Sequence, residues 1–140
     1  MKHSSFYCFA IFTLSIGLLG CGGASDQPEL GTVSGTVTLD GEPVADAKIQ
    51  FLPTEGGRPS FGTSNAEGVF TLNYNAASLG ATIGPHIVTI TTFKQEELEP
   101  GVPGYQPGVE ERIPKKYWEN SELKQVVAAG DNQIDFALTQ

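Results

Sequence analysis

Cys21 is the residue whose position most clearly indicates chemistry. It follows a basic start, Lys2 and His3, and an apolar run of 14 residues from Phe6 to Leu19. A helix of that length spans roughly 21 Å, which is short of the ~30 Å hydrocarbon core of a bilayer. A basic start, a short apolar run and small residues at its end therefore predict a cleaved export signal over residues 1–20.

The four residues that end with Cys21 resemble the lipobox of bacterial lipoproteins. Leu18 stands three residues before the cysteine and Gly20 directly before it. The resemblance implies cleavage before Cys21, a diacylglycerol thioether on its sulfur and acylation of the new amine. Two or more acyl chains anchor a protein firmly, whereas a single chain binds membranes marginally. The alternative is a freely secreted protein in which Cys21 is incidental.

The lipobox resemblance implies a lipoprotein anchored in a membrane of the cell envelope. Residue 22 is Gly rather than Asp. If the host is Gram-negative, this residue favours the outer membrane over the inner one. The membrane is then the expected partner of the lipid on Cys21.

The composition excludes several kinds of chemistry. The other cysteine, Cys8, lies in the leader, so a mature chain lipidated on Cys21 has no free thiol and no disulfide. The chain carries 16 acidic and 8 basic side chains, for a formal net charge of −8. This acidic excess argues against electrostatic binding to nucleic acid or to anionic lipid.

His86 is the single histidine outside the leader. A histidine-based metal site or catalytic triad needs partners, and neither a second histidine nor a free cysteine remains. The serines and threonines show no activated-nucleophile motif. We therefore expect His86 to be a packed structural residue, and we predict no catalytic residue, no metal and no cofactor.

The chain after residue 21 divides into a tether and one domain. Residues 21–31 are small, polar and without periodicity, which predicts a flexible tether after the lipidated cysteine. From Thr32 apolar and polar residues alternate, which is typical of half-buried strands. We expect strands at 32–39, 47–52, 61–64, 69–75, 86–94, 126–128 and 133–138, the last two as a hairpin around residues 130–132. Seven short strands without a helix predict one antiparallel β-sandwich over residues 32–140.

Three segments in order resemble a carboxypeptidase regulatory-like domain. They are residues 33–51, with VSGTV, DGEPV and AKIQF; residues 65–72, NAEGVFTL; and residues 84–90, GPHIVTI. The tail, with residues 114–117 (PKKY), looks like that of small bacterial lipoproteins built on this domain. The resemblance implies a transthyretin-like (prealbumin-like) seven-strand sandwich. In carboxypeptidases this domain is an accessory without catalytic residues, so the resemblance implies a structural or binding role.

Three functions follow from these observations. The main hypothesis is a lipid-anchored, non-catalytic β-sandwich of the cell envelope with a structural or binding role, which contacts an envelope protein or glycan. The alternative is a carbohydrate- or peptide-binding accessory of an envelope transport or degradation system. A transthyretin-like hydrolase would need several clustered His and Arg residues, and the C-terminus ALTQ differs from that of those enzymes.

The acidic residues are expected to gather at one end of the sandwich. If successive strands reverse direction, the first, third and fifth connections share the end opposite to the tether. Ordinary solvated loops, Ca²⁺ binding and docking of a basic partner are the three alternatives for this end. The acidic residues in those connections are Asp40, Glu42, Asp46, Glu67, Glu96, Glu97, Glu99, Glu110, Glu111, Glu119 and Glu122.

The long connection after the fifth strand contains the aromatic candidates for partner contact. Tyr105 stands among prolines and glycines, and Tyr117 and Trp118 follow two lysines. A loop longer than ~15 residues in a compact domain is often functional or disordered. The aromatics are therefore candidates for contact with a glycan or peptide. The alternative is that Tyr117 or Trp118 packs over an open edge or end of the sandwich and pins the loop.

Overall fold

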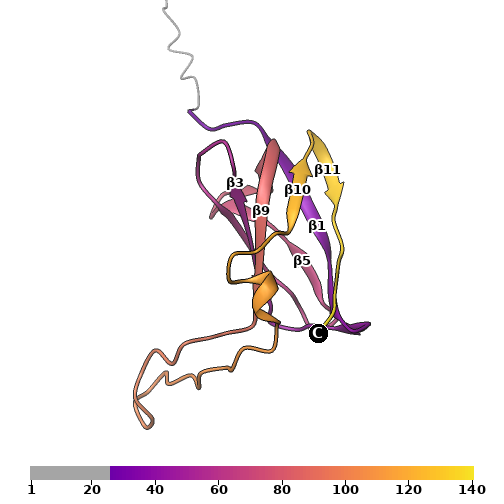
Figure 1. Ribbon diagram of the computed structural model, residues 1–140. Helices are drawn as coiled ribbons and strands as arrows, with labels where there is room; N and C mark the ends of the chain where they lie inside the picture. Colours follow the sequence, from indigo (N-terminus) through magenta and orange to yellow (C-terminus); the bar gives the residue numbers. More distant parts are fainter. Residues whose placement is uncertain (1–25) are drawn as a thin grey trace, which may run out of the picture.

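The computed structural model describes residues 26–140, so the predicted signal, Cys21 and most of the tether lie outside the described part. The described chain is all-β, with twelve short strands, β1 to β12, and one 3₁₀ turn, η1, at Lys115–Tyr117. The strands form two sheets that pack face to face (Figure 1). Within residues 26–140 no helix is long and apolar enough to cross a membrane.

The first sheet is built around β1 (Leu30–Leu39). This strand pairs antiparallel with β2 (Glu42–Pro43), β5 (Val69–Thr71) and β8 (Ala81–Thr82). It pairs parallel with β11 (Gly130–Gln133) and β12 (Phe136–Leu138).

The second sheet is antiparallel throughout. Its strand order is β10 (Lys124–Val127), β9 (Gly84–Thr91), β3 (Lys48–Pro53), β4 (Ser60–Thr63), β6 (Asn73–Asn75) and β7 (Ser78–Leu79). The pairing of β3 with β9 runs over six residue pairs and forms the centre of this sheet.

The core lies between the two sheets and follows the period-two pattern of the sequence. Val33 and Val37 of β1 face Ile49 and Phe51 of β3, and all four side chains are fully buried. The ring of Phe136 packs edge-on against the ring of Phe51, with 6.2 Å between the ring centroids. Alternation places every second side chain on the inner face, as the alternating pattern from Thr32 predicts.

Two expectations about strand pairing are wrong. The sandwich is not purely antiparallel, because β11 and β12 run parallel to β1. Residues 126–138 do not form a hairpin, because β10 lies in the second sheet and β11 in the first. The Asn132 side chain explains the separation: it bonds both the N–H and the C=O of Ala128, at 2.9 Å and 2.8 Å, and so takes the backbone groups that a hairpin partner would use.

Two further expectations about the middle of the chain need correction. The predicted strand 69–75 is interrupted at the fully buried Leu72, where the chain leaves the first sheet as β5 and enters the second as β6. The connection at 76–85, where no strand was expected, contains the short strands β7 and β8.

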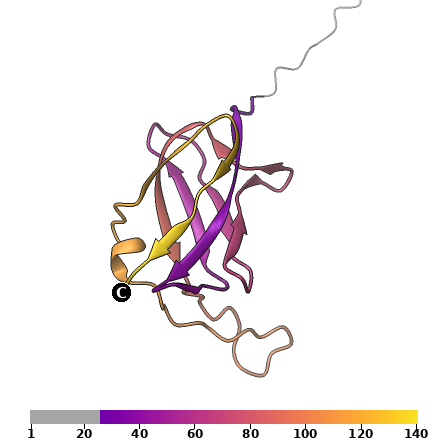
Figure 2. The ribbon, with the colours of Figure 1, turned by 90° about the vertical axis from the view of Figure 1, so that its right-hand side faces the viewer.

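The connections divide between two ends of the sandwich (Figure 2). The chain enters β1 at one end, the entry end, where β8 and β11 also begin. The connections 40–47, 64–68 and 92–123 lie at the other end, the distal end, together with the C-terminus, where Asp40 donates its N–H to the Leu138 carbonyl at 2.8 Å. The expected gathering of these three connections at one end is therefore confirmed, although β11 and β12 follow one another in the same direction.

Candidate functional site

The distal end is dominated by the long loop at residues 92–123. The loop leaves β9, extends away from the sandwich and returns through η1 to β10 (Figure 1). Its two arms are joined by a β-bridge in which Lys94 and Val109 exchange N–H to C=O bonds of 3.0 Å and 2.8 Å. Tyr105 lies beyond this bridge and donates its hydroxyl to the Glu96 carboxylate, a bond that raises the pKa of Tyr105.

Glu111 fastens the returning arm of the loop to the end of β9. Its carboxylate accepts bonds from the Thr92 N–H at 2.9 Å, the Thr92 hydroxyl at 2.9 Å and the Ile113 N–H at 2.8 Å, and also from the Thr91 hydroxyl. Burial acts to raise the pKa of Glu111, but these hydrogen bonds outweigh it and hold the pKa below its ordinary value. Glu111 is therefore a structural acceptor rather than a free acidic surface group.

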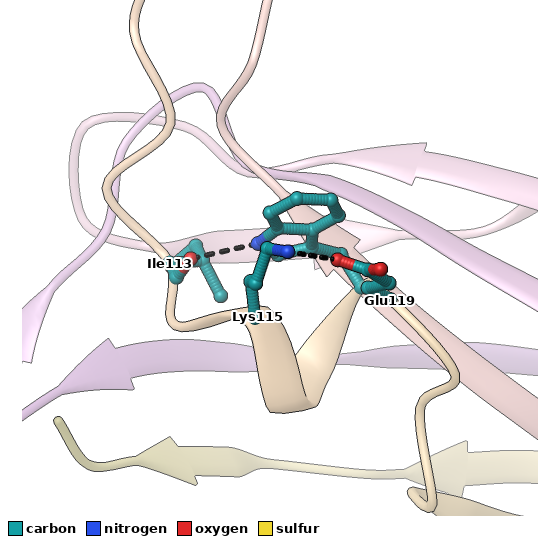
Figure 3. Close-up of polar contacts among 4 residues, drawn as sticks. Ile113, Lys115 and Glu119 are labelled. Atoms are coloured by element: carbon teal, nitrogen blue, oxygen red, sulfur yellow. Dashed lines mark hydrogen bonds and ion pairs between the residues drawn. The ribbon is translucent and has the colours of Figure 1, made fainter.

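Trp118 holds the 3₁₀ turn against the sandwich, next to the contacts of Ile113, Lys115 and Glu119 that Figure 3 shows. Its ring is partly buried against the core cluster, and its indole N–H donates to the Ile113 carbonyl at 2.8 Å. Lys115 lies 5.9 Å from the ring centroid and pairs with Glu119 at 2.6 Å. An exposed ion pair of this kind contributes little by itself, so the packing of the indole is the main fastening here.

Tyr117 fastens the same turn to the C-terminus. Its hydroxyl accepts the Thr139 N–H at 3.1 Å, and the Lys116 ammonium lies 5.1 Å from its ring centroid. The hydrogen bonds with Thr139, and then the Lys116 charge, lower the pKa of Tyr117. Tyr117 and Trp118 thus pack against the core cluster from one turn, whereas Tyr105 lines a separate hollow on the loop with Phe93.

The acidic side chains of the distal end do not converge on one point. In the described chain, no group of three or more His, Cys, Asp or Glu side chains is arranged to hold a metal ion. The structure therefore offers no cluster for the Ca²⁺ alternative. The same end also carries basic residues, whose positive charges partly offset the negative charge of the carboxylates: Lys48, Lys94, Arg112, Lys115 and Lys116.

His86 lies at the entry end and is 1% exposed. Its Nδ1–H donates to the Gly84 carbonyl at 3.0 Å, so its Nε2 accepts from the Thr82 hydroxyl at 3.2 Å. Its ring packs on Phe51 at 5.7 Å. Burial lowers the pKa of His86, and the bond to Gly84 opposes that shift only partly. The expected packing role is confirmed.

The arginines that a transthyretin-like hydrolase would need beside His86 make their contacts elsewhere. Arg112 donates to the Ala45 carbonyl at 3.0 Å, at the distal end. The Arg58 guanidinium lies 5.8 Å from the centroid of the Tyr74 ring.

Protonation of His86 is expected to destabilise the fold. Because the folded-state pKa is lowered, the stability contributed by the neutral ring is fully present above the ordinary value of 6.5 and is lost as the pH falls through the lowered pKa. Because one proton is involved, the unfolding free energy cannot change by more than about 1.4 kcal/mol per pH unit. We expect the ring protons of His86 to titrate below 6.5 in NMR spectra of the folded protein, and His86→Gln to remove that part of the pH dependence of the unfolding free energy.

Sequence reasoning missed a groove along the open edge of the sandwich. This edge groove has a volume of about 660 Å³, and its lining includes Arg58, Phe61, Gly62, Thr71, Asn73 and Tyr74. It lies where β4 of the second sheet passes β5 of the first. The available signal was Phe61, an aromatic residue on the outward face of a strand between the inward Ser60 and Gly62.

Comparison with protein-family models and with curated proteins finds no match. Among solved structures, the chain is similar to a crystal structure of a DUF3823 family protein from Parabacteroides merdae, with 14% sequence identity and a TM-score of 0.39. The match covers 78% of this chain and 45% of that chain, so this chain spans less than half the length of that protein. Similarity at this level does not bear on function.

Proposed function

We propose that the protein is a lipid-anchored, non-catalytic β-sandwich of the cell envelope, with a structural or binding role at its distal end. One observation carries the proposal: the chain enters at one end of the sandwich, and the long loop lies at the other. An anchor on Cys21 then turns the loop away from the membrane. The ten residues of β1 separate the two ends by about 30 Å at the rise of an extended strand.

The proposal includes the assignment to carboxypeptidase regulatory-like domains of transthyretin-like fold, which rests on the three sequence segments that resemble that family. The close approach of the Ile134 backbone to Gly35 supports this assignment, because a Cβ at Gly35 would lie 1.7 Å from the Ile134 carbonyl oxygen. Tyr105, Tyr117 and Trp118 remain the proposed contacts for an envelope protein or glycan. The proposed location is a membrane of the cell envelope, which is the outer rather than the inner membrane if the host is Gram-negative.

The orientation can be tested on the lipidated protein in vesicles that carry an acceptor dye on their headgroups. The mature chain has no free thiol when Cys21 is lipidated, so one added cysteine takes the donor dye. Gln106→Cys labels the long loop and Glu55→Cys labels an entry-end loop, both at exposed positions. We expect clearly weaker energy transfer from position 106 than from position 55, because the loop faces away from the bilayer.

Cys21→Ala is the control for the anchor. We expect this variant to lose energy transfer at both positions, and its intact mass to lack the diacylglyceryl and acyl groups that the parent protein carries. Equal transfer from positions 55 and 106 would contradict the orientation. An unlipidated mass for the parent protein would contradict the anchor itself.

A second candidate function, a carbohydrate- or peptide-binding accessory, is supported by the edge groove. The groove has no acidic residue in its lining, although the chain as a whole is strongly acidic. A concave site with aromatic and neutral polar side chains is the usual form of a small-ligand site.

A further inference from the structure

The floor of the edge groove is closed by backbone. A Cβ at Gly62 would lie 2.7 Å from the Thr71 carbonyl oxygen, so β4 and β5 touch directly at this point. The two strands nevertheless belong to different sheets, and β4 pairs with β6 only at Phe61 and Asn73. The contact leaves no room for a further strand between β4 and β5, which argues against binding of an extended peptide by strand addition there.

Arg58 supplies the only charge in the groove lining. Its guanidinium lies over one face of Tyr74, and within residues 26–140 it forms no ion pair. A guanidinium offers several N–H donors in a planar fork that matches a carboxylate. In a chain with net charge −8, a groove with a cation and no carboxylate is suited to an anionic ligand.

Two aromatic rings share the groove lining with this cation. Phe61 is 50% exposed although it lies on a strand, and Tyr74 is half-buried beside it in the lining. An exposed aromatic ring offers an apolar face, on which the C–H face of a sugar ring packs favourably. Within residues 26–140 Phe61 forms no ring pair with another aromatic residue, and its exposed half is accessible for such packing.

Neutral hydrogen-bonding groups complete the groove. Asn75 uses its side-chain oxygen to accept the Ala77 N–H at 2.8 Å, which orients its amide while leaving both N–H donors unused. The Asn73 amide and the hydroxyls of Thr63 and Thr71 also line the groove. Amide and hydroxyl side chains are the neutral groups that hydrogen-bond sugar hydroxyls.

We propose that the edge groove binds a saccharide that carries a carboxylate, with Arg58 on the carboxylate, Phe61 under a sugar ring and Asn73 and Asn75 on its hydroxyls. This inference rests on the second candidate function and names its ligand class. It does not depend on the anchor or on the distal end.

Calorimetric titration of the purified lipidated protein in detergent tests the inference. The probes are a galacturonic acid oligosaccharide and a neutral galactose oligosaccharide of the same length. We expect the uronic acid form to bind at least about tenfold more tightly, because it adds a charge-assisted bidentate contact. Its affinity should fall with added salt, since the ion pair is exposed to solvent.

Arg58→Ala and Phe61→Ala are each expected to weaken uronate binding at least about fivefold. Lys124→Ala and Phe93→Ala are the matched controls, because they remove an exposed cation and an exposed aromatic ring outside the groove. Far-ultraviolet circular dichroism checks that each variant is folded.

The inference is overturned if the uronic acid oligosaccharide does not bind, if the neutral one binds equally well, or if the controls lose as much affinity as the groove variants. It is also overturned if an extended peptide of alternating Thr and Val binds instead and loses affinity in the groove variants. Failure of saccharide binding leaves the lipid mass and the energy-transfer result unchanged, so it is distinguishable from failure of the anchored role.

Discussion

Replacement of Gly35 by alanine is expected to destabilise the fold by about 3 kcal/mol or more. A Cβ at this position would lie 1.7 Å from the Ile134 carbonyl oxygen and 3.0 Å from a ring atom of Phe70. The Ile134 backbone cannot move aside, because its N–H donates to the Ser34 carbonyl at 2.8 Å and its chain continues into β12 beside β1. The cost is steric, since the clash is with backbone in the centre of the first sheet.

Gly41→Ala is the matched control for this prediction. Gly41 has φ of +86°, but nothing lies within 4 Å of its added Cβ. Its replacement therefore costs only backbone strain, about 1 kcal/mol. Denaturant unfolding followed through the fluorescence of the single tryptophan, Trp118, measures both changes. Failure of Gly35→Ala to fold supports the prediction, whereas equal midpoints for the two variants would contradict the steric explanation.

The faces of the strands were predictable because alternation is a local property of the sequence. Val33, Val37, Ile49 and Phe51 alternate with polar neighbours, and all four are buried. Close approach of a neighbour at Gly35 was also predictable, because a glycine inside a strand pattern commonly marks such an approach.

The pairing of the last strands was not predictable from the sequence, because it depends on contacts about 100 residues apart. Residues 124–127 and 130–133 have the spacing of a hairpin, and Gly130 with φ of +84° fits a turn. The outcome is decided by β1, which has a free edge for β11, and by the Asn132 amide, which also donates to the Thr32 carbonyl at 3.0 Å. Hydrophobic alternation carries no information on such partners.

In the candidate sites too, features that depend on neighbouring residues were predictable, and features that depend on residues far apart in the sequence were not. Packing of Trp118 against the sandwich was among the expected alternatives, because an aromatic residue at the end of a long loop usually covers an edge. Glu111 was grouped with free acidic residues, because its hydrogen-bond donors on Thr91 and Thr92 lie 19 or 20 residues away in the sequence. The edge groove was missed because its lining comes from separate segments around Arg58 and Tyr74.

Glu111→Ala is expected to lower the free energy of unfolding by about 3 kcal/mol, because several hydrogen-bond donors lose their charged acceptor at once. The N–H groups of Thr92 and Ile113 and the Thr92 hydroxyl would lose their partner. Glu110→Ala is the matched control, since this neighbour is exposed and its side chain makes no hydrogen bond within residues 26–140. A similar loss in both variants would show that the stability of the loop return depends on the backbone rather than on the carboxylate.

The pH dependence distinguishes the ionised carboxylate from simple packing. The folded-state pKa of Glu111 is lowered, so its contribution is fully present above the ordinary value of 4.5 and is lost as the pH falls through the lowered pKa. The difference in unfolding free energy between the parent protein and Glu111→Ala should therefore be constant near neutral pH and shrink below about 4.5. If this difference in unfolding free energy stays unchanged at acidic pH, the result would contradict the role of the ionised Glu111 carboxylate.

The same variant tests whether the distal end is held rigid as a contact surface. Because Glu111 joins the end of β9 to Ile113, two residues before η1, its loss should free the loop locally before the sandwich unfolds. We expect hydrogen exchange to accelerate at the Lys94 and Val109 amides of the β-bridge, while the amides of β3 and β9 in the centre of the second sheet keep their protection. Uniform acceleration over both regions would instead make the loop and the sandwich one cooperative unit, in which the distal end has no mobility of its own.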